Sequence, residues 1–187
     1  MMFMSPSKGV TLIELIIVTS LFSITIMLAA PSLSSFSIKN RITSQMNTLA
    51  GAIRMARGSA ISLNRVVTLC RSDNQLQCQG RWQDGMILFV DNNKDHVFNG
   101  DDYYLTKFEQ IPNGDTIFWR AFQNRQYLQM SPRGFTRYQN GTFTYCPKEG
   151  LNYARGIILN AQGRVRFTKD EDQDGIDEGA NGRPLRC

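Results

Sequence analysis

The stretch that decides the fold lies near the start of the chain and reads KGVTLIELIIVTSLFSITIMLAA, residues 8–30. From Val10 to Ala30 it is apolar except for Glu14 and a few small hydroxyl side chains. A helix rises about 1.5 Å per residue, so a run of about 21 such residues spans the core of a bilayer. Lys8 precedes the run and favours a cytoplasmic N-terminus. The segment therefore predicts one membrane-spanning helix.

Glu14 separates this segment from two more ordinary kinds. A secretory signal peptide has a shorter apolar core, followed by a cleavage site with small residues. A plain membrane anchor would not carry a carboxylate in its first turns, because a charge in lipid is costly and usually functional. Instead, Lys8-Gly9 followed by an apolar segment whose fifth residue is Glu14 resembles the leader of type IV prepilins. Pro31 also matches the pilin pattern.

This resemblance implies a set of processing and assembly steps. Cleavage follows Gly9, and the new amino group of Val10 is methylated, although Phe or Met is commoner there. Glu14 pairs with the N-terminal amine of a neighbouring subunit, because two charges that are each costly in lipid become tolerable together. The expected partners are the inner membrane, a prepilin peptidase and the other pilins of the filament. The expected location is the bacterial inner membrane, as a single-pass protein with a periplasmic domain, and then the pilus at the cell surface.

We expect four parts along the chain. They are a leader (1–9), a transmembrane and filament-core helix (10–30), an amphipathic half of the same helix (31–64) and a periplasmic β-rich domain (65–187). Pro31 should bend the helix without ending it. Beyond it, apolar residues recur at spacings of four and three and form one stripe for packing on the domain. The stripe contains Ile42, Met46, Leu49, Ile53, Ala56, Ala60 and Leu63.

From residue 65 onward, short β-rich segments alternate with turns. The predicted strands are 65–71, 85–91, 103–109, 116–120, 126–131, 142–146, 154–160 and 164–168. Asn-Gly turns separate several of them, for example at Asn99 and Asn140. This pattern suggests antiparallel sheets packed on one helix. The expected fold class is α+β, with a long N-terminal pilin helix packed on a C-terminal antiparallel β-sheet or β-sandwich domain.

Two later segments are similar to the FimT/GspH family of minor pilins and pseudopilins. One is Ile53–Asn64 in the helix, and the other is the tryptophan, glycine, strand and aspartate of Trp82–Asp91. Their order along the chain is more specific than either segment alone. Together with the leader, they give the chain a resemblance to a FimT-like minor pilin of this family.

The four cysteines, Cys70, Cys78, Cys146 and Cys187, allow three pairings. No CxxC is present and the lone His96 has no cysteine nearby in sequence, so an exported domain with two disulfides fits better than a zinc site. A local Cys70–Cys78 bridge is the economical choice, and it leaves Cys146 to pair with Cys187. The second bridge closes a loop of about 40 residues and removes roughly 4 kcal/mol of unfolded-state freedom.

The sequence contains no motif of a known enzyme class. GxSxG, HExxH, P-loop and GxGxxG sequences are all missing. His96 lies among Asp and Asn in a turn-like stretch, where we expect an exposed loop residue rather than a catalytic base. We therefore expect neither enzymatic activity nor a bound cofactor.

An acidic stretch near the C-terminus is a weak calcium candidate. Asp170, Asp172 and Asp174 occupy positions one, three and five of a loop with glycine at position six, a spacing that suits calcium. Position twelve is Asn181 rather than a bidentate glutamate, and no flanking helix pair is evident. The segment Asp91–Asp95 is a weaker echo that lacks the glycine. The alternative is a solvated acidic loop, so no metal is assigned.

DNA is the more specific partner that the sequence suggests. The net charge of +5 modestly favours anionic partners. In Gly163-Arg164-Val165-Arg166, strand alternation puts both arginines on one face, where guanidinium groups can hold phosphate oxygens. Gly163 lets the chain turn and approach closely. This GRxR segment resembles the motif by which FimT proteins bind DNA in natural transformation. The patch could extend to Arg155, Lys169, Arg183 and Arg186 if the tail folds back.

The charge balance of this region argues against strong binding. Residues 147–187 contain seven basic and seven acidic residues. Six of the carboxylates follow the arginines directly, at Asp170, Glu171, Asp172, Asp174, Asp177 and Glu178. Unless they point away or hold a cation, they repel phosphate, so binding should be weak, independent of sequence and sensitive to salt.

Three functions stay open on the sequence alone. The first is a minor pilin in or near the pilus tip that binds extracellular double-stranded DNA. The second is a structural minor pilin that primes pilus assembly, and the third is a type II secretion pseudopilin without DNA binding. The GRxR segment favours the first over the third.

Overall fold

The structure is a computed structural model that describes residues 9–73, 76–112 and 114–187. Side chains are described throughout these ranges except at residues 28–31. The predicted leader, apart from Gly9, lies outside the described residues. The chain forms two compact units, Met1–Asn40 and Arg41–Cys187, and one helix, α1 (Leu12–Leu63), contributes to both. The helix continues through position 31, so Pro31 does not end it, as predicted.

In the first unit, α1 begins at a threonine cap. Thr11 Oγ1 accepts a hydrogen bond from the amide of Glu14 at 3.3 Å, which satisfies one of the free amides at the helix start. The hydroxyls of Thr19 and Ser23 donate to carbonyls one turn earlier, at 2.9 and 2.7 Å. The side chains of residues 10–27 are all exposed. By length and composition, this stretch could cross a membrane.

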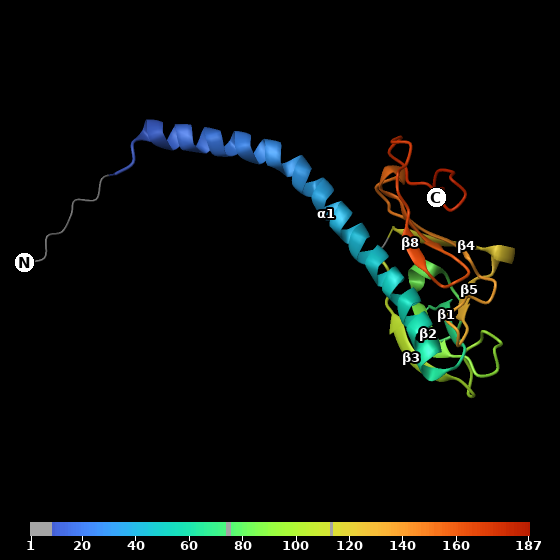
Figure 1. Ribbon diagram of the computed structural model, residues 1–187. Helices are drawn as coiled ribbons and strands as arrows, with labels where there is room; N and C mark the ends of the chain where they lie inside the picture. The colour runs from blue at the N-terminus through green and yellow to red at the C-terminus, as the bar shows by residue number, and fades with distance from the viewer. Residues whose placement is uncertain (1–8, 74–75, 113) are drawn as a thin grey trace, which may run out of the picture. The chain divides into compact units, whose positions relative to one another are not determined.

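The second unit contains two four-stranded antiparallel sheets (Figure 1). The first sheet, in the order β3-β2-β1-β5, contains β1 (Val67–Arg71), β2 (Met86–Val90), β3 (Tyr103–Phe108) and β5 (Tyr127–Met130). The second sheet, in the order β4-β6-β7-β8, contains β4 (Thr116–Ala121), β6 (Gly141–Cys146), β7 (Arg155–Leu159) and β8 (Val165–Phe167). Each observed strand falls on a predicted one, with bounds that differ by at most two residues.

The part of α1 in this unit supplies one side of the core and runs along the sheets in Figure 1. The predicted stripe is buried at six of its seven positions, from Ile42 to Ala60, and Ala50 and Ala52 are buried beside it. Leu63 was predicted to join the stripe, which is wrong, because its side chain is 48% exposed. Leu63 is the last helical residue, and Asn64 takes a left-handed conformation (φ 52°) that turns the chain away.

Aromatic side chains fill the inner face of the second sheet. Trp119 on β4 stacks on Phe143 of the neighbouring β6, with ring centroids 3.9 Å apart. Trp82, from the short 3-10 helix Trp82–Asp84, meets the same phenyl ring edge-on at 5.0 Å. These rings place the core of the unit between α1 and the sheets, so the outer face of the second sheet is left for other contacts.

A buried ionic network fixes the start of the second unit to β6. The Asp115 carboxylate, whose side chain is fully buried, accepts hydrogen bonds from Arg41, from the Tyr145 hydroxyl and from the Lys148 amide. Arg41 also donates to Glu149 at 2.6 Å. Burial, and then the hydrogen bond to Asp115, raise the pKa of Tyr145. Burial lowers the pKa of Arg41, but the two carboxylates outweigh it and raise that pKa.

We predict that Asp115→Asn lowers the free energy of unfolding of a fragment spanning residues 35–187. The loss should be about 2–4 kcal/mol, because removing one partner of a buried pair leaves the other charge poorly compensated. Urea denaturation followed by tryptophan fluorescence would report it, since Trp82 and Trp119 are both only 3% exposed.

The matched control for this prediction is Glu109→Gln. It removes a carboxylate from the Lys107–Glu109 pair, whose side chains are 50% and 69% exposed, and should cost less than ~1 kcal/mol. Equal losses in the two variants would contradict the stabilising role of the buried network.

Candidate functional site

The β7–β8 hairpin presents the predicted GRxR segment on a tight turn. The Asn160 amide donates to the Arg164 carbonyl at 3.1 Å, and the Gly163 amide donates to the Asn160 carbonyl at 3.0 Å. The Asn160 side-chain oxygen also accepts from the Arg164 amide at 3.0 Å. Gly163 has a φ of 69°, which glycine adopts without steric cost. The turn is therefore well defined up to the first arginine.

This turn is braced by a second loop and by α1. A Cβ atom on Gly163 would lie 2.5 Å from the Gly134 carbonyl oxygen and 3.0 Å from Arg57 Cδ. Arg57 Nε donates to the same carbonyl at 3.0 Å, and the Thr136 amide donates to the Ala161 carbonyl at 2.9 Å. Gly163 thus allows three segments to approach one another closely, and they hold the turn in place.

Arg164 and Arg166 are both exposed on the outer face of the second sheet, as strand alternation predicts. The register extends this face across all four strands. Arg166 lies opposite Ile158, Ile158 opposite Thr142, and Thr142 opposite Arg120. Arg120 is also exposed, so an arginine stands at each edge of the sheet in one cross-strand row. Arg120 lies on β4, far from the GRxR segment in sequence, and was not predicted to belong to the site.

Two arginine-lined grooves adjoin this face. The tail groove, about 340 Å³ in volume, lies between the sheet and the C-terminal tail, and its arginines are Arg120, Arg183 and Arg186. The turn groove, about 410 Å³, lies between α1 and the hairpin, and its arginines are Arg54, Arg57 and Arg164. Among the residues that the structure describes, neither groove is lined by an acidic side chain. Both can therefore accept an anion without an opposing charge in their lining.

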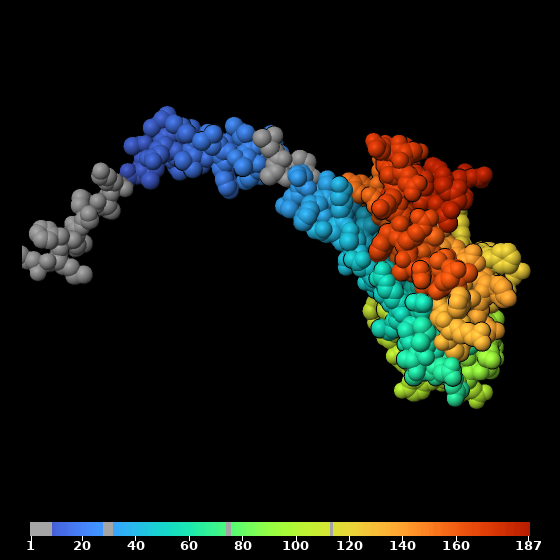
Figure 2. All heavy atoms as spheres, in the orientation of Figure 1, coloured from blue at the N-terminus to red at the C-terminus, as the bar shows by residue number. Residues whose placement is uncertain are grey.

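A disulfide places the tail beside the sheet. Cys146 at the end of β6 is bonded to Cys187, with Cα atoms 5.7 Å apart. Leu185 is 5% exposed, and its amide donates to the Asp177 carbonyl at 2.9 Å. In the space-filling view, the red tail adjoins the orange hairpin on the surface of this unit (Figure 2). The bridge therefore brings Arg183 and Arg186 to the sheet from far along the chain.

Two of the predicted patch residues do not join this face. Arg155 pairs in register with Tyr145, whose side chain points into the core. Strand alternation therefore places Arg155 on the inner face of the sheet, whereas Arg166 is on the outer face. Its guanidinium donates to the Ala154 carbonyl at 2.7 Å and lies 3.6 Å from Asp177. The Lys169 side chain is exposed, but its backbone forms an antiparallel β-bridge with Glu178 of the acidic loop. The basic surface is thus built from Arg164 and Arg166 with Arg120, Arg183 and Arg186.

The acidic loop contains one more cluster member than the sequence suggested. Asp170, Asp172 and Asp174 gather with Glu178, and one carboxylate oxygen from each lies within 4.8 Å of the others. Counting to position nine rather than twelve would have found Glu178. Asp170 follows Arg164 by six residues and Arg166 by four, so the loop is close in sequence to the basic face. Salt screens its repulsion of phosphate, with a Debye length of about 8 Å at physiological ionic strength.

The second disulfide and the lone histidine belong to the outer face of the first sheet. Cys70 is bonded to Cys78, with Cα atoms 5.4 Å apart. His96 lies in a loop, as expected, but it is half-buried rather than exposed. Its ring stacks on that of Tyr127, with centroids 4.0 Å apart. This contact is a sufficient structural reason for the histidine.

Comparison with known families decides the class of the protein. A family model described as type II transport protein GspH matches residues 45–163, which covers more than half of the chain. The chain belongs to this family. It is therefore a GspH-like minor pilin or pseudopilin, a filament subunit that assembles with other pilins. No curated protein matches the chain in sequence.

Solved structures agree with the fold of this GspH-like protein. A crystal structure of the type IV minor pilin FimU of Pseudomonas aeruginosa superposes with a TM-score of 0.56 at 17% identity, covering 72% of this chain and 92% of that one. A second crystal form of FimU superposes with a TM-score of 0.51 at 16% identity, covering 68% of this chain and 92% of that one. At such low identity the likeness concerns the fold alone. The expected α+β architecture, with a pilin helix and antiparallel sheets, is confirmed.

We predict that Gly163→Ala destabilises the fragment 35–187 more than Gly182→Ala does. Both glycines have nearly the same φ, 69° and 67°, so both variants carry the left-handed strain of about 1 kcal/mol. Only at Gly163 would the new methyl group meet a backbone oxygen, because nothing lies within 4 Å of a Cβ on Gly182. The clash should add about 1–3 kcal/mol, measurable by urea denaturation. Equal losses would show that the turn is not braced.

Proposed function

We propose that this chain is a FimT-like minor pilin, in or near the pilus tip, that binds extracellular double-stranded DNA without sequence preference for natural transformation. The observation that carries the proposal is the basic outer face of the second sheet. It presents five exposed arginines, Arg120, Arg164, Arg166, Arg183 and Arg186. Guanidinium groups suit phosphate oxygens because they offer several donors in a fixed plane. Such a surface binds the DNA backbone, which is the same in every sequence.

The bracing of the hairpin supports this proposal. Gly163 lies against the Gly134 carbonyl and the Arg57 side chain, so the position of the turn that carries Arg164 is set before any ligand arrives. Loop ordering is one of the costs of association, and a turn that is already ordered avoids it. The turn groove also adds Arg54 and Arg57 of α1, which extends the basic surface past the edge of the sheet.

The N-terminal segment supports a pilin route to the cell surface. We propose that a prepilin peptidase cleaves after Gly9, that Val10 is then N-methylated, and that Glu14 pairs with the new amine of a neighbouring subunit. The capped start of α1 and its exposed apolar side chains, which suit lipid or other helices, support this assignment. The protein would first cross the inner membrane once, with the second unit in the periplasm, and then enter the pilus.

A second candidate function is a type II secretion pseudopilin without DNA binding. The description of the matching family as a type II transport protein favours it. A structural minor pilin that primes pilus assembly needs the same helix and the same fold. Counting pili and measuring DNA uptake in a deletion strain separates these roles. Only if the protein binds DNA should the deletion strain lose DNA uptake while it keeps its number of pili.

We predict that the fragment 35–187 shifts duplex DNA in a gel at low salt and that Arg164→Gln with Arg166→Gln abolishes most of the shift. Each lost phosphate contact should reduce the slope of log K against log salt by about 1, so the double variant should lose about 2. Duplexes of different sequence should bind equally well.

The matched control is Arg65→Gln with Arg81→Gln. It removes the same charge from two exposed arginines outside the basic face. Circular dichroism would verify the fold of each variant. If the folded wild-type fragment gives no shift at low salt, or if both double variants weaken binding equally, the DNA-binding proposal is wrong.

A further inference from the structure

The acidic loop 170–178 holds more negative charge than its hydrogen bonds can compensate. Oxygens from Asp170, Asp172, Asp174 and Glu178 lie within 4.8 Å of one another. Carboxylates at such distances repel strongly unless a cation lies between them. The Arg155 guanidinium does not neutralise this cluster, because it lies beside Asp177 instead.

Two oxygens of this cluster are buried and accept no hydrogen bond from the residues that the structure describes. They are Asp170 Oδ1 and Glu178 Oε1. Glu178 is only 8% exposed, and its other oxygen accepts from the Glu171 amide at 2.6 Å. A buried carboxylate oxygen without a partner is expensive, and buried charges in proteins are normally paired or coordinate a metal. These two oxygens are the observation that points to a ligand.

The loop backbone is also arranged as a cation-binding loop requires. The Gly175 amide donates to Asp170 Oδ2 at 2.9 Å, which orients the carboxylate at position one. The amides of Asp174 and Ile176 donate to the side chains two residues earlier, at 3.2 and 2.8 Å. Gln173 and Gly175, at positions four and six, are left-handed, with φ of 65° and 92°. This backbone accompanies the convergence of the four carboxylates on one centre.

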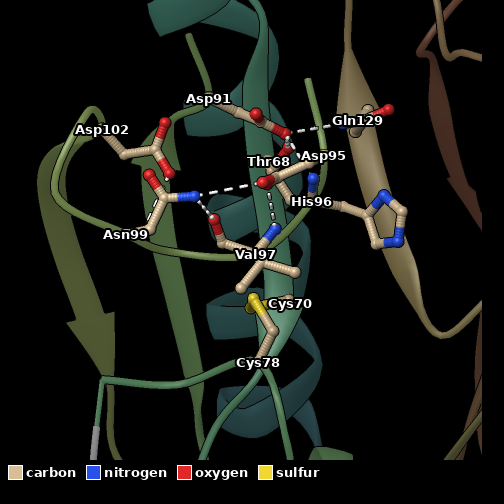
Figure 3. Close-up of a disulfide and its surroundings, with 10 residues drawn as sticks. All are labelled: Thr68, Cys70, Cys78, Asp91, Asp95, His96, Val97, Asn99, Asp102 and Gln129. Carbon is tan, nitrogen blue, oxygen red and sulfur yellow. Dashed lines mark hydrogen bonds between the residues drawn. A yellow bond between two sulfur atoms is a disulfide. The ribbon is translucent and has the colours of Figure 1, made fainter. Parts of the chain in front are cut away.

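A second loop, residues 91–102, follows the same plan on the outer face of the first sheet (Figure 3). The His96 amide donates to Asp91 Oδ2 at 3.0 Å. The amides of Asp95 and Val97 donate to the side-chain oxygens two residues earlier, at 3.2 and 2.8 Å. Lys94 and His96, at positions four and six, are again left-handed, with φ of 66° and 58°. Position by position, these are the hydrogen bonds and dihedrals of loop 170–178. The histidine stands where that loop has glycine.

An independent buried oxygen marks this second loop. Asp91 is 1% exposed, and its Oδ2 accepts from Thr68, Gln129 and His96, at 2.7, 2.6 and 3.0 Å. Its Oδ1 is buried and accepts from no group in the described chain. Oxygens of Asp91, Asp95 and Asp102 lie within 4.8 Å of one another. Asp102 is the twelfth residue of this loop, which is the position of the last ligand in a calcium loop.

We propose that loop 170–178 binds one calcium ion through Asp170, Asp172, Asp174 and Glu178, and that loop 91–102 binds a second through Asp91, Asp95 and Asp102. All these ligands are hard oxygens, which calcium and magnesium prefer over thiol or imidazole. Loops that offer several carboxylates, each able to bind through one or two oxygens, suit the six to eight ligands of calcium better than the strict octahedron of magnesium. The proposal does not depend on DNA binding.

Calorimetric titration of the full chain in detergent micelles with calcium, after treatment with a chelator, tests this proposal. The expected result is two bound calcium ions, with Kd values of about 10⁻⁴–10⁻³ M or tighter, as in extracellular calcium modules. Magnesium should bind at least about tenfold more weakly. Calcium should also raise Tm, because a ligand that binds only the folded state stabilises it.

Each loop has its own variant and its own matched control. Asp172→Asn with Asp174→Asn changes two exposed ligands and should remove one calcium, while Glu171→Gln changes an exposed carboxylate outside the cluster and should keep both. Asp95→Asn should weaken the other site at least about tenfold, while Asp101→Asn should leave it unchanged. Circular dichroism of the variants without calcium verifies their fold.

The outcomes separate the two sites from each other and from non-specific binding. No saturable heat at calcium concentrations up to about 10 mM, well above the expected Kd range, would overturn the whole proposal. Binding that survives the variant of one loop would overturn the assignment of that loop. A loss caused equally by the ligand variants and their controls would show general charge attraction rather than a site.

Discussion

The burial of one face of α1 is the constraint on which the rest of the second unit depends. Ala50, Ala52, Ala56 and Ala60 on this face are completely buried, and only small side chains let a helix approach its neighbours so closely. That approach puts Arg57 within hydrogen-bonding distance of the loop that supports the β7–β8 turn. At the other end of the face, Arg41 meets the buried Asp115. The helix thus fixes both the core and one border of the basic surface.

The functional surface is assembled by register and by a disulfide rather than by neighbouring residues. Arg120 and Arg166 share a row only because β4, β6, β7 and β8 pair in a particular alignment. The tail arginines join because Cys187 is bonded to Cys146. The outer face of the second sheet is available for this surface because the stacked rings of Trp119 and Phe143 lie on the inner face. A surface of this kind depends on the whole fold being formed.

The helix and strands could be predicted well from the sequence, but which residues of different strands and loops lie side by side could not. Strands could be located because β-branched runs end at turn residues, and the helix stripe because its apolar period is clear. Arg155 was misplaced, since its face is set by the register with Tyr145, which no local pattern contains. Arg120 was missed for the same reason. Glu178 was not predicted as a calcium ligand because a twelve-residue template was applied to a loop that closes at its ninth position. Long-range register and loop closure are therefore what the sequence left out.

The position of β8 has a consequence for solubility. It is a three-residue strand at the end of its sheet, so among the described strands it has a neighbour on one edge only. Free strand edges are templates on which a second chain can add, and natural proteins protect them with short strands and charged side chains. Two copies meeting edge to edge here would bring the guanidinium groups of Arg164 and Arg166 against those of the other copy. Like-charge repulsion would therefore oppose pairing of the two sheets at this edge.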